Sequence, residues 1–309
     1  MIVRLGLALV VGLGLTVGGY QGARGLEASA QEQVMQLQAR HVHEVGAFRV
    51  GDLEQALRET AVFVMEREVN LMNFEPRLRV AYDKNPAFRA VAWLPVVKNP
   101  EADEFLAQVR RTIPDFAFRE MDPETGEIGP AGTALAYVPF LLMWPEHGNT
   151  ELMGVDLGNQ PHLAEAMQQT YRIDHVAAAS ASVLPPDDGR SFLMLHYVRS
   201  PEGFIGGILR VEDLLAHVME GAPEGFAGRI LDHTGGSEVL ATQPGFVESD
   251  AVVGGSFVLG GRRMMFELAP TAAYDPLGLQ LAEAVGFGGA GVTFVLLALA
   301  LLGAPAKES

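Results

Sequence analysis

The sequence predicts an α+β protein, in which a long N-terminal helix leads into antiparallel sheets and an apolar run lies at each end. Residues 24–70 contain no proline and are rich in Glu, Gln, Ala and Arg, which are good helix formers. From Phe88 onward, short segments rich in β-branched and aromatic residues alternate with turns that contain proline or glycine. Residues 5–23 and 284–302 carry no charge. The sequence therefore predicts a helix, then sheets, between two candidate membrane segments.

The two uncharged runs predict transmembrane helices at residues 1–23 and 277–303, because about twenty apolar residues suffice to cross a bilayer. A cleaved signal peptide is the alternative for the first run, with residues 28–30 as the cleavage site. That site lies well beyond the apolar run, which favours an uncleaved anchor. Arg4 beside the first run favours a cytoplasmic N-terminus in a bacterial inner membrane, whereas the nearly neutral tail adds almost no signal. We expect both termini to be cytoplasmic and the rest to be extracytoplasmic, an arrangement that depends mainly on the family resemblance below.

Residues 24–70 predict a stalk helix. Within it, Leu53, Leu57, Ala61 and Val64 fall at helical spacing and form one apolar face. Glycines at positions 46 and 51 predict a break or kink between a first helical part and a second part docked on the domain.

The region after the stalk predicts two sheets, over residues 71–219 and 220–275. Helices are expected at 101–111, 160–171 and 212–219. Strands are expected at 88–97, 137–143, 177–184, 192–198, 204–211, 228–232, 238–241, 256–259 and 263–268. Such a mixture is typical of an α+β domain with antiparallel sheets.

Composition excludes several classes of function. The net charge of −16 argues against a nucleic-acid partner, because phosphate binding requires clustered Lys and Arg. The absence of cysteine excludes disulfides and thiolate metal sites. The chain also lacks a phosphate-binding Gly-x4-Gly-Lys-Ser/Thr loop, a His-Glu-x-x-His pair and a Gly-x-Ser-x-Gly turn, and its histidines are scattered. We therefore expect no catalysis, no metal and no cofactor.

Four motifs follow one another along the chain. They are Asn85-Pro86 leading to Trp93-Leu94-Pro95, then Tyr137-Val138-Pro139, Gly154-Val155-Asp156-Leu157, and Gly203-Phe204-Ile205-Gly206-Gly207 leading to Val211-Glu212-Asp213-Leu214. Together they resemble one family, the CHASE sensor domain of bacterial receptors and plant cytokinin-receptor histidine kinases. The resemblance implies PAS-like sheets, one distal and one proximal to the membrane, and a ligand-binding, non-catalytic role.

The resemblance also implies an output domain after the second membrane segment, whereas only residues 303–309 follow Leu302. We therefore expect a sensor that binds a small ligand and signals across the membrane without an output domain in this chain. The alternative is a structural or interaction subunit that docks to a separate membrane partner. A parallel homodimer through the stalk and the glycine-bearing first membrane segment is expected, with a monomer whose helix packs on its own domain as the alternative.

The resemblance places Asp156 at the Gly-x-Asp-Leu position whose aspartate contacts an adenine-like ligand in the plant receptors. Met143, Ala181 and Met194 lie on strands expected to flank it and would form the apolar walls. The alternative role for Asp156 is structural, because an aspartate at this position can accept hydrogen bonds from backbone N–H groups in the turn before a helix. The identity of the ligand does not follow, since residues 140–145 and 195–198 depart from the family pattern.

Overall fold

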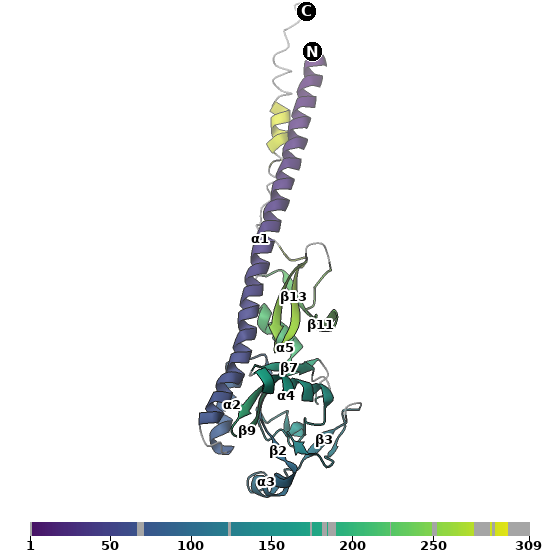
Figure 1. Cartoon of the computed structure of the whole chain (residues 1–309). Coiled ribbons are helices and arrows are strands. Elements are labelled where there is room, and N and C mark those ends of the chain that lie inside the picture. Colours follow the sequence, from purple (N-terminus) through teal and green to yellow (C-terminus); the bar gives the residue numbers. More distant parts are fainter. Residues whose placement is uncertain are drawn as a thin grey trace, which may run out of the picture. The chain divides into compact units, whose positions relative to one another are not determined.

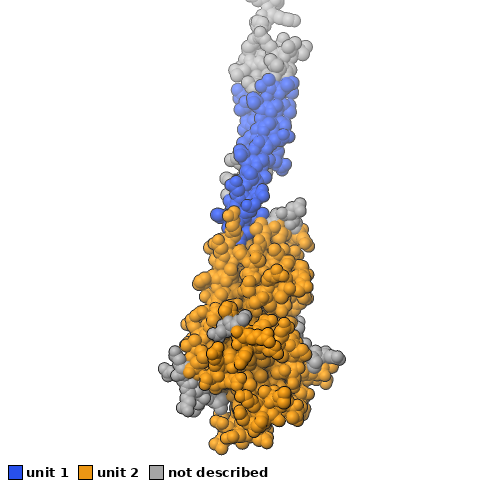
Figure 2. Space-filling view, viewed as in Figure 1, with its two compact units in different colours: residues 1–39, 273–309 blue, residues 40–272 orange. Residues whose placement is uncertain are grey.

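A computed structural model gives the fold of the chain (Figure 1). It describes residues 2–66, 71–122, 125–173, 175–180, 184, 190–222, 224–248, 252–274, 285 and 288–295. Two compact units are present, one formed by residues 1–39 and 273–309 and the other by residues 40–272 (Figure 2). Each unit is described by itself below.

The first unit contains the start of helix α1, which spans Ile2–Glu66. Its N-terminal part packs against helical residues 288–295, and the hydroxyls of Thr16 and Thr293 lie 3.2 Å apart. Glycine permits the close approach: a Cβ atom on Gly12 would lie 2.7 Å from Thr293 Cγ2, and one on Gly289 would lie 2.8 Å from Thr16 Cγ2. The contact therefore depends on small residues at the crossing.

The prediction of two flanking transmembrane helices is wrong for the part of the chain that the structure describes. Within those residues, none of the helices combines the length and the apolar character that crossing a bilayer requires. Such a helix needs about twenty predominantly apolar residues. The uncharged part of α1 whose side chains are described runs only from Leu9 to Ala23 and is rich in glycine. Most of the second predicted span, 277–303, lies outside the described residues.

In the second unit, α1 continues without interruption to Glu66. Leu53, Leu57, Ala61 and Val64 are all fully buried, which confirms the predicted apolar face. The predicted break near Gly46 is wrong. That glycine instead allows the helix to approach a neighbour, because a Cβ atom there would lie 2.7 Å from Val218 Cγ1.

The larger sheet has five antiparallel strands in the order β6-β1-β9-β8-β7. Their bounds are β1 Phe88–Pro95, β6 Leu142–Trp144, β7 Ala177–Ser180, β8 Ser191–Arg199 and β9 Glu202–Arg210. Helix α2 (Leu71–Asp83) packs against β1 and β6, and helix α4 (Pro161–Ile173) packs against β7 and β8 (Figure 1). On the α4 side, Thr170 Oγ1 accepts a hydrogen bond of 3.1 Å from the Tyr197 backbone N–H.

The segment between β1 and β7 forms short elements beside this sheet. They are β2 Val97–Lys98, the 3₁₀ helix η1 Asn99–Glu101, α3 Ala102–Val109, β3 Arg119–Met121, β4 Ile128–Pro130, β5 Ala136–Tyr137 and the 3₁₀ helix η2 Thr150–Leu152. The single strand expected at 137–143 is two strands, because β5 pairs with β2 whereas β6 pairs with β1. Pro139, which lacks a backbone N–H, lies between them.

The smaller sheet has four antiparallel strands in the order β11-β10-β13-β12. The strands are β10 Phe226–Asp232, β11 Glu238–Thr242, β12 Val253–Leu259 and β13 Arg262–Pro270, and helix α5 (Val211–Met219) packs against β10 and β11. Both sheets and the long helix confirm the predicted α+β class with antiparallel sheets.

Gly260, in the turn between β12 and β13, joins the two sheets and α1. Its carbonyl accepts a 2.8 Å hydrogen bond from the Ala178 N–H of β7, and its own N–H donates to Glu54 Oε1 of α1 at 3.0 Å. The residue has φ +53°, and a Cβ atom there would lie 2.5 Å from both Cβ and N of Ala178. Only glycine fits this contact, because both the backbone conformation and the space exclude a side chain.

This contact predicts that alanine substitution lowers the stability of the chain more at Gly260 than at the neighbouring Gly261. Gly261 also has positive φ, at +83°, but nothing lies within 4 Å of the point that a Cβ atom would occupy there. We expect Gly261→Ala to lower the free energy of unfolding by about 1 kcal/mol through backbone strain, and Gly260→Ala by about 3 kcal/mol because overpacking is added. Urea denaturation of the full chain measures both values. Equal losses in the two variants would contradict the close packing at Gly260.

Candidate functional site

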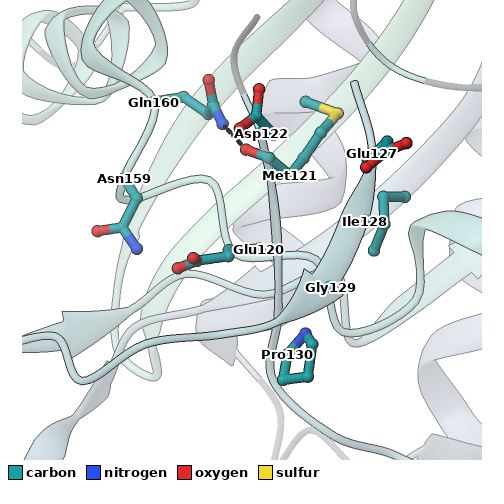
Figure 3. A pocket seen from close by; sticks show the side chains of 9 residues that line it. All are labelled: Glu120, Met121, Asp122, Glu127, Ile128, Gly129, Pro130, Asn159 and Gln160. Atoms are coloured by element: carbon teal, nitrogen blue, oxygen red, sulfur yellow. Dashed lines mark hydrogen bonds between the residues drawn. The ribbon is translucent and has the colours of Figure 1, made fainter. Parts of the chain in front are cut away.

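A cavity of about 420 Å³ lies beside the β3–β4 hairpin and the two residues that precede α4 (Figure 3). Its lining contains three carboxylates, two amides and an apolar part of similar size. The lining residues are Glu120, Met121, Asp122, Glu127, Ile128, Gly129, Pro130, Asn159 and Gln160. The volume lies within the range of small-molecule sites in proteins.

Local hydrogen bonds fix the hairpin that forms one wall. Strands β3 and β4 pair antiparallel, with Met121 opposite Ile128. At the turn, the Gly126 N–H donates to the Asp122 carbonyl at 2.9 Å, and Gly126 has φ +73°, a conformation that favours glycine. On the other side of β3, the Arg119 N–H donates to the Gly154 carbonyl at 2.9 Å. The hairpin is thus held at both its turn and its base.

Gln160 connects the start of α4 to this hairpin. Its side chain is 1% exposed, and its Nε2 donates a 2.6 Å hydrogen bond to the Met121 carbonyl, drawn as a dashed line in Figure 3. Its Oε1 is buried and has no hydrogen-bond partner among the described residues. A buried amide oxygen without a partner is costly, and in this position of the side chain the atom is not accessible from the cavity.

The cavity has an acidic wall. Glu120 is half-buried, and its Oε2 accepts a 3.0 Å hydrogen bond from the Gly132 N–H. Asp122 and Glu127 are exposed at the rim. Lysine, arginine and histidine are absent from the described residues that line the cavity. Within the described residues, moreover, no His, Asp or Glu side chains form a group of three or more that could hold a metal ion.

Asp156 is not among the residues that line the cavity. The side chain is fully buried, and its Oδ1 accepts hydrogen bonds from the Val138 N–H at 2.6 Å and the Gly158 N–H at 2.9 Å. Its Oδ2 is buried without a partner among the described residues. Burial raises the pKa of the Asp156 carboxyl above its ordinary value; the two backbone hydrogen bonds oppose this, and nearby Glu120 adds to it. The carboxylate therefore fills the structural role considered for it, and it retains one unused oxygen.

The other residues expected at the site are not brought together. Met143 on β6 and Met194 on β8 lie on opposite faces of the larger sheet. Met143 is paired with Ala92 of β1, and Met194 belongs to the same cross-strand row as Val91 of β1. Ala92 and Val91 are neighbours on one strand, so their side chains point to opposite faces of the sheet. Met194 is fully buried, and Ala181 lies outside the described residues.

Met143 lines a second cavity, of about 430 Å³, at the free edge of the larger sheet. Its lining is Glu75, Leu78, Thr112, Ile113, Pro114, Leu142, Met143, Trp144, Glu146 and Met153. This lining is more apolar than that of the first cavity, and none of these described residues has a buried polar side-chain atom without a partner. The second cavity therefore offers fewer polar groups that could bind a ligand than the first cavity does.

Sequence reasoning missed the residues that line the first cavity. Glu120, Asp122, Glu127 and Gln160 belong to no motif singled out above, and the two three-residue strands of the hairpin were not predicted. A signal was present, because Thr125-Gly126 is a turn dipeptide between two short segments. Strands of three residues are below the length at which periodicity can be detected.

Comparisons with known proteins agree with this fold. A family model described as the CHASE domain matches residues 68–241, which is more than half of the chain. The chain belongs to the CHASE domain family. The family resemblance noted in the sequence is thus confirmed. A comparison with curated protein sequences gave no match.

Solved structures with a similar fold include the periplasmic sensory domain of the Campylobacter jejuni chemoreceptor Tlp1. It is 11% identical to this CHASE domain, the match covers 79% of this chain and 96% of that chain, and the TM-score is 0.50. An extracellular ligand binding receptor from Desulfohalobium retbaense is 10% identical, with a TM-score of 0.45; the match covers 76% of this chain and 39% of that chain. At this identity the likeness extends to the fold alone.

The geometry of Asp156 predicts a pH effect on stability. Because its pKa is higher in the folded chain than in the unfolded chain, its contribution to stability is fully present below the unfolded pKa and is lost as the pH rises through the folded pKa. We expect the wild type to gain stability relative to Asp156→Asn as the pH is lowered from neutral toward the ordinary carboxyl range. Denaturant midpoints at several pH values measure this difference, and a constant difference would contradict the raised pKa.

The same site gives a matched pair of variants that lack the titrating group. Asparagine keeps an acceptor for the Val138 and Gly158 N–H groups, whereas alanine removes it. We expect Asp156→Ala to unfold with a free energy about 2 kcal/mol lower than that of Asp156→Asn at every pH, because two backbone donors lose their partner. If alanine were as stable as asparagine, the two hydrogen bonds would not hold this turn.

Proposed function

We propose that the chain is a sensor that binds a small molecule in the cavity between the β3–β4 hairpin and Gln160 and reports its occupancy to a signalling partner. The observation that carries the proposal is the Gln160 side chain, which is 1% exposed and has an amide oxygen without a partner among the described residues. Native proteins satisfy most buried polar groups, so an unsatisfied one on a residue that lines a cavity supports a ligand that repositions this side chain and becomes its missing partner.

A continuous series of contacts connects the cavity to α1, which supports the proposal that the chain reports ligand binding to a partner. Gln160 immediately precedes α4, which packs on β7 and β8. From β7, the Ala178 N–H donates to Gly260, whose own N–H donates to Glu54 on α1. A ligand that repositions Gln160 could therefore shift α4 and this chain of contacts, provided that it binds two conformations with different affinity.

Binding in this cavity predicts where a ligand protects the chain. We expect a small molecule that raises the melting temperature of the full chain also to slow hydrogen exchange at the amides of β3, β4 and the first turn of α4. The amides around Met143, at the second cavity, serve as the internal control and should exchange at their original rate. Protection at Met143 alone would move the site to the second cavity. If no small molecule stabilised the chain, a purely structural docking subunit would be the better assignment.

A homodimer through α1 is part of the proposal. Leu26 and Leu37 are 66% and 67% exposed. They are eleven residues apart, which is about three turns of helix, so both side chains lie on one face of this part of α1. Two exposed leucines on one face support a second copy of α1 as the partner, since helix pairs bury such rows against each other.

Cross-linking tests the dimer without a background of native thiols, because the chain has no cysteine. We expect Leu37→Cys to form an intermolecular disulfide under mild oxidation, since the residue would lie at the helix–helix contact. Gln36→Cys is the matched control, because it is exposed and points about 100° away around the helix. Equal cross-linking of the two variants would reflect random collision and would argue against the dimer.

A further inference from the structure

We infer that the contact between α1 and the C-terminal end of α5 is a pH-sensitive joint, which loosens when His217 takes up a proton as the surroundings become acidic. This joint is separate from the proposed ligand site, because it responds to acidity and contains none of the residues that line the first cavity. The packing of α1 on α5, the burial of the imidazole and the charges around it support the assignment.

Helix α1 and the last turn of α5 are in close contact (Figure 1). Gly46 of α1 lies so near Val218 of α5 that a Cβ atom on the glycine would be 2.7 Å from Val218 Cγ1. Three residues further along α1, the guanidinium of Arg49 donates a hydrogen bond to the His217 carbonyl. Carbonyls in the last turn of a helix have no partner within the helix, so Arg49 caps α5 from a neighbouring element.

The imidazole of His217 is largely buried in this contact. Its side chain is 14% exposed, and its Nδ1 lies 3.5 Å from Glu220 Oε2. The same carboxylate oxygen lies 3.5 Å from Arg49 Nη1. While His217 is neutral, Glu220 and Arg49 balance each other. A protonated imidazole adds a second positive charge, which has to share one carboxylate with an arginine that is always charged.

The charged groups that act on this imidazole come from α1 and from the chain after α5. They are Arg49 and Asp52 of α1, and Glu220. His41 of α1 is also near, because it lines a cavity of about 230 Å³ at this contact together with Arg49 and Glu220. His43 packs against β12 instead.

The other charged side chains on α5 and on the strands that it packs against lie elsewhere. Glu212 and Asp213 are exposed in the first turn of α5, and Arg210 immediately precedes that helix, about two turns from His217. Those of β9, β10 and β11 form the ion pairs Glu202–Lys98, Arg229–Glu267, Asp232–Arg262 and Glu238–Arg190.

The balance of these effects disfavours the charged imidazole. Burial lowers the pKa of His217 below its ordinary value, and the charge of Arg49 lowers it further, while Glu220 and Asp52 oppose the shift. Because the folded pKa lies below the unfolded one, the stability that His217 contributes is fully present above the unfolded pKa and is lost as the pH falls toward the folded pKa. An arrangement in which water reaches the imidazole takes up the proton more readily, so acid shifts the population toward a separated α1 and α5.

Amide hydrogen exchange in the full chain tests the joint at about pH 7.5 and about pH 5.5, on either side of the ordinary histidine pKa. Protection factors are compared, because they remove the pH dependence of the chemical exchange itself. At the lower pH we expect the protection of residues 42–50 and 215–219 to fall about threefold or more, while β8 and β9 of the larger sheet keep theirs.

A matched pair of variants identifies the titrating group. His217→Gln removes it and keeps a side chain that can donate to Glu220, so we expect no loss of protection on acidification. The control is His147→Gln, which makes the same change at an exposed position outside the joint and should behave like the wild type. Asp156, whose pKa is raised, is present in all three proteins, so its effect on stability cancels in the comparison.

Glu220→Gln is a second variant, at a side chain that is 67% exposed. Glu220 favours the protonated imidazole, so its removal should move the loss of protection to a lower pH. Titration of the His217 imidazole by NMR in the wild type, with its signal assigned by its absence in His217→Gln or by its shift in Glu220→Gln, should give a pKa below the ordinary histidine value.

The joint is overturned if the wild type keeps its protection at the lower pH or if His217→Gln loses as much protection as the wild type. Equal losses in β8 and β9 would overturn it too, because they would reflect acid unfolding of the whole domain. If His217→Gln does not fold, the wild-type titration decides, and an imidazole that titrates at or above the ordinary value contradicts the joint. None of these results bears on ligand binding in the first cavity.

Discussion

The site depends on one buried carboxylate. Asp156 Oδ1 accepts hydrogen bonds from the N–H groups of Val138 and Gly158, and its own backbone N–H donates to the Arg119 carbonyl at 2.7 Å. The segments around residues 119, 138 and 158 thereby meet at a single residue. Taking an ionisable group out of water is costly, and the backbone donors offset only one of its two oxygens. These hydrogen bonds fix the end of β3 at Arg119 and the turn at Gly158, two residues before Gln160.

Close packing at glycine gives the second constraint. Gly260, at the turn of the smaller sheet, makes hydrogen bonds to Ala178 of the larger sheet and to Glu54 of α1. A methyl group at this position would overlap with Ala178. Gly46 allows α1 to approach α5 in the same way. Tightly packed contacts of this kind have few alternative arrangements. They are the contacts through which the proposed sensor would pass a shift of α4 or β7 to α1.

The two candidate residues Met143 and Met194 illustrate how the sheet divides the molecule. Both are apolar, both lie on strands, and the linear sequence places both near the family motif. Side chains alternate between the two faces of a sheet, and a strand shifted by one residue exchanges its faces. Because Met143 pairs with Ala92, and Met194 lies in the cross-strand row of Val91, the two methionines point to opposite faces of the larger sheet. That register is set by pairing between strands more than a hundred residues apart in the sequence, which no local pattern reveals.

The sequence by itself determined the α+β class, the buried face of α1 at Leu53 and Leu57, most strands of both sheets and the membership of the CHASE family, because these follow from local periodicity and contiguous motifs. It also suggested both roles for Asp156. Only the tertiary structure decided that α1 passes Gly46 without a break, and that Glu120, Glu127 and Gln160 share one cavity. Both facts depend on contacts between distant segments. Only those contacts show that Gly46 allows a close approach rather than a kink, and that Glu120 and Glu127 line a cavity. Hydrophobic patterning is local, whereas a binding site is assembled by packing.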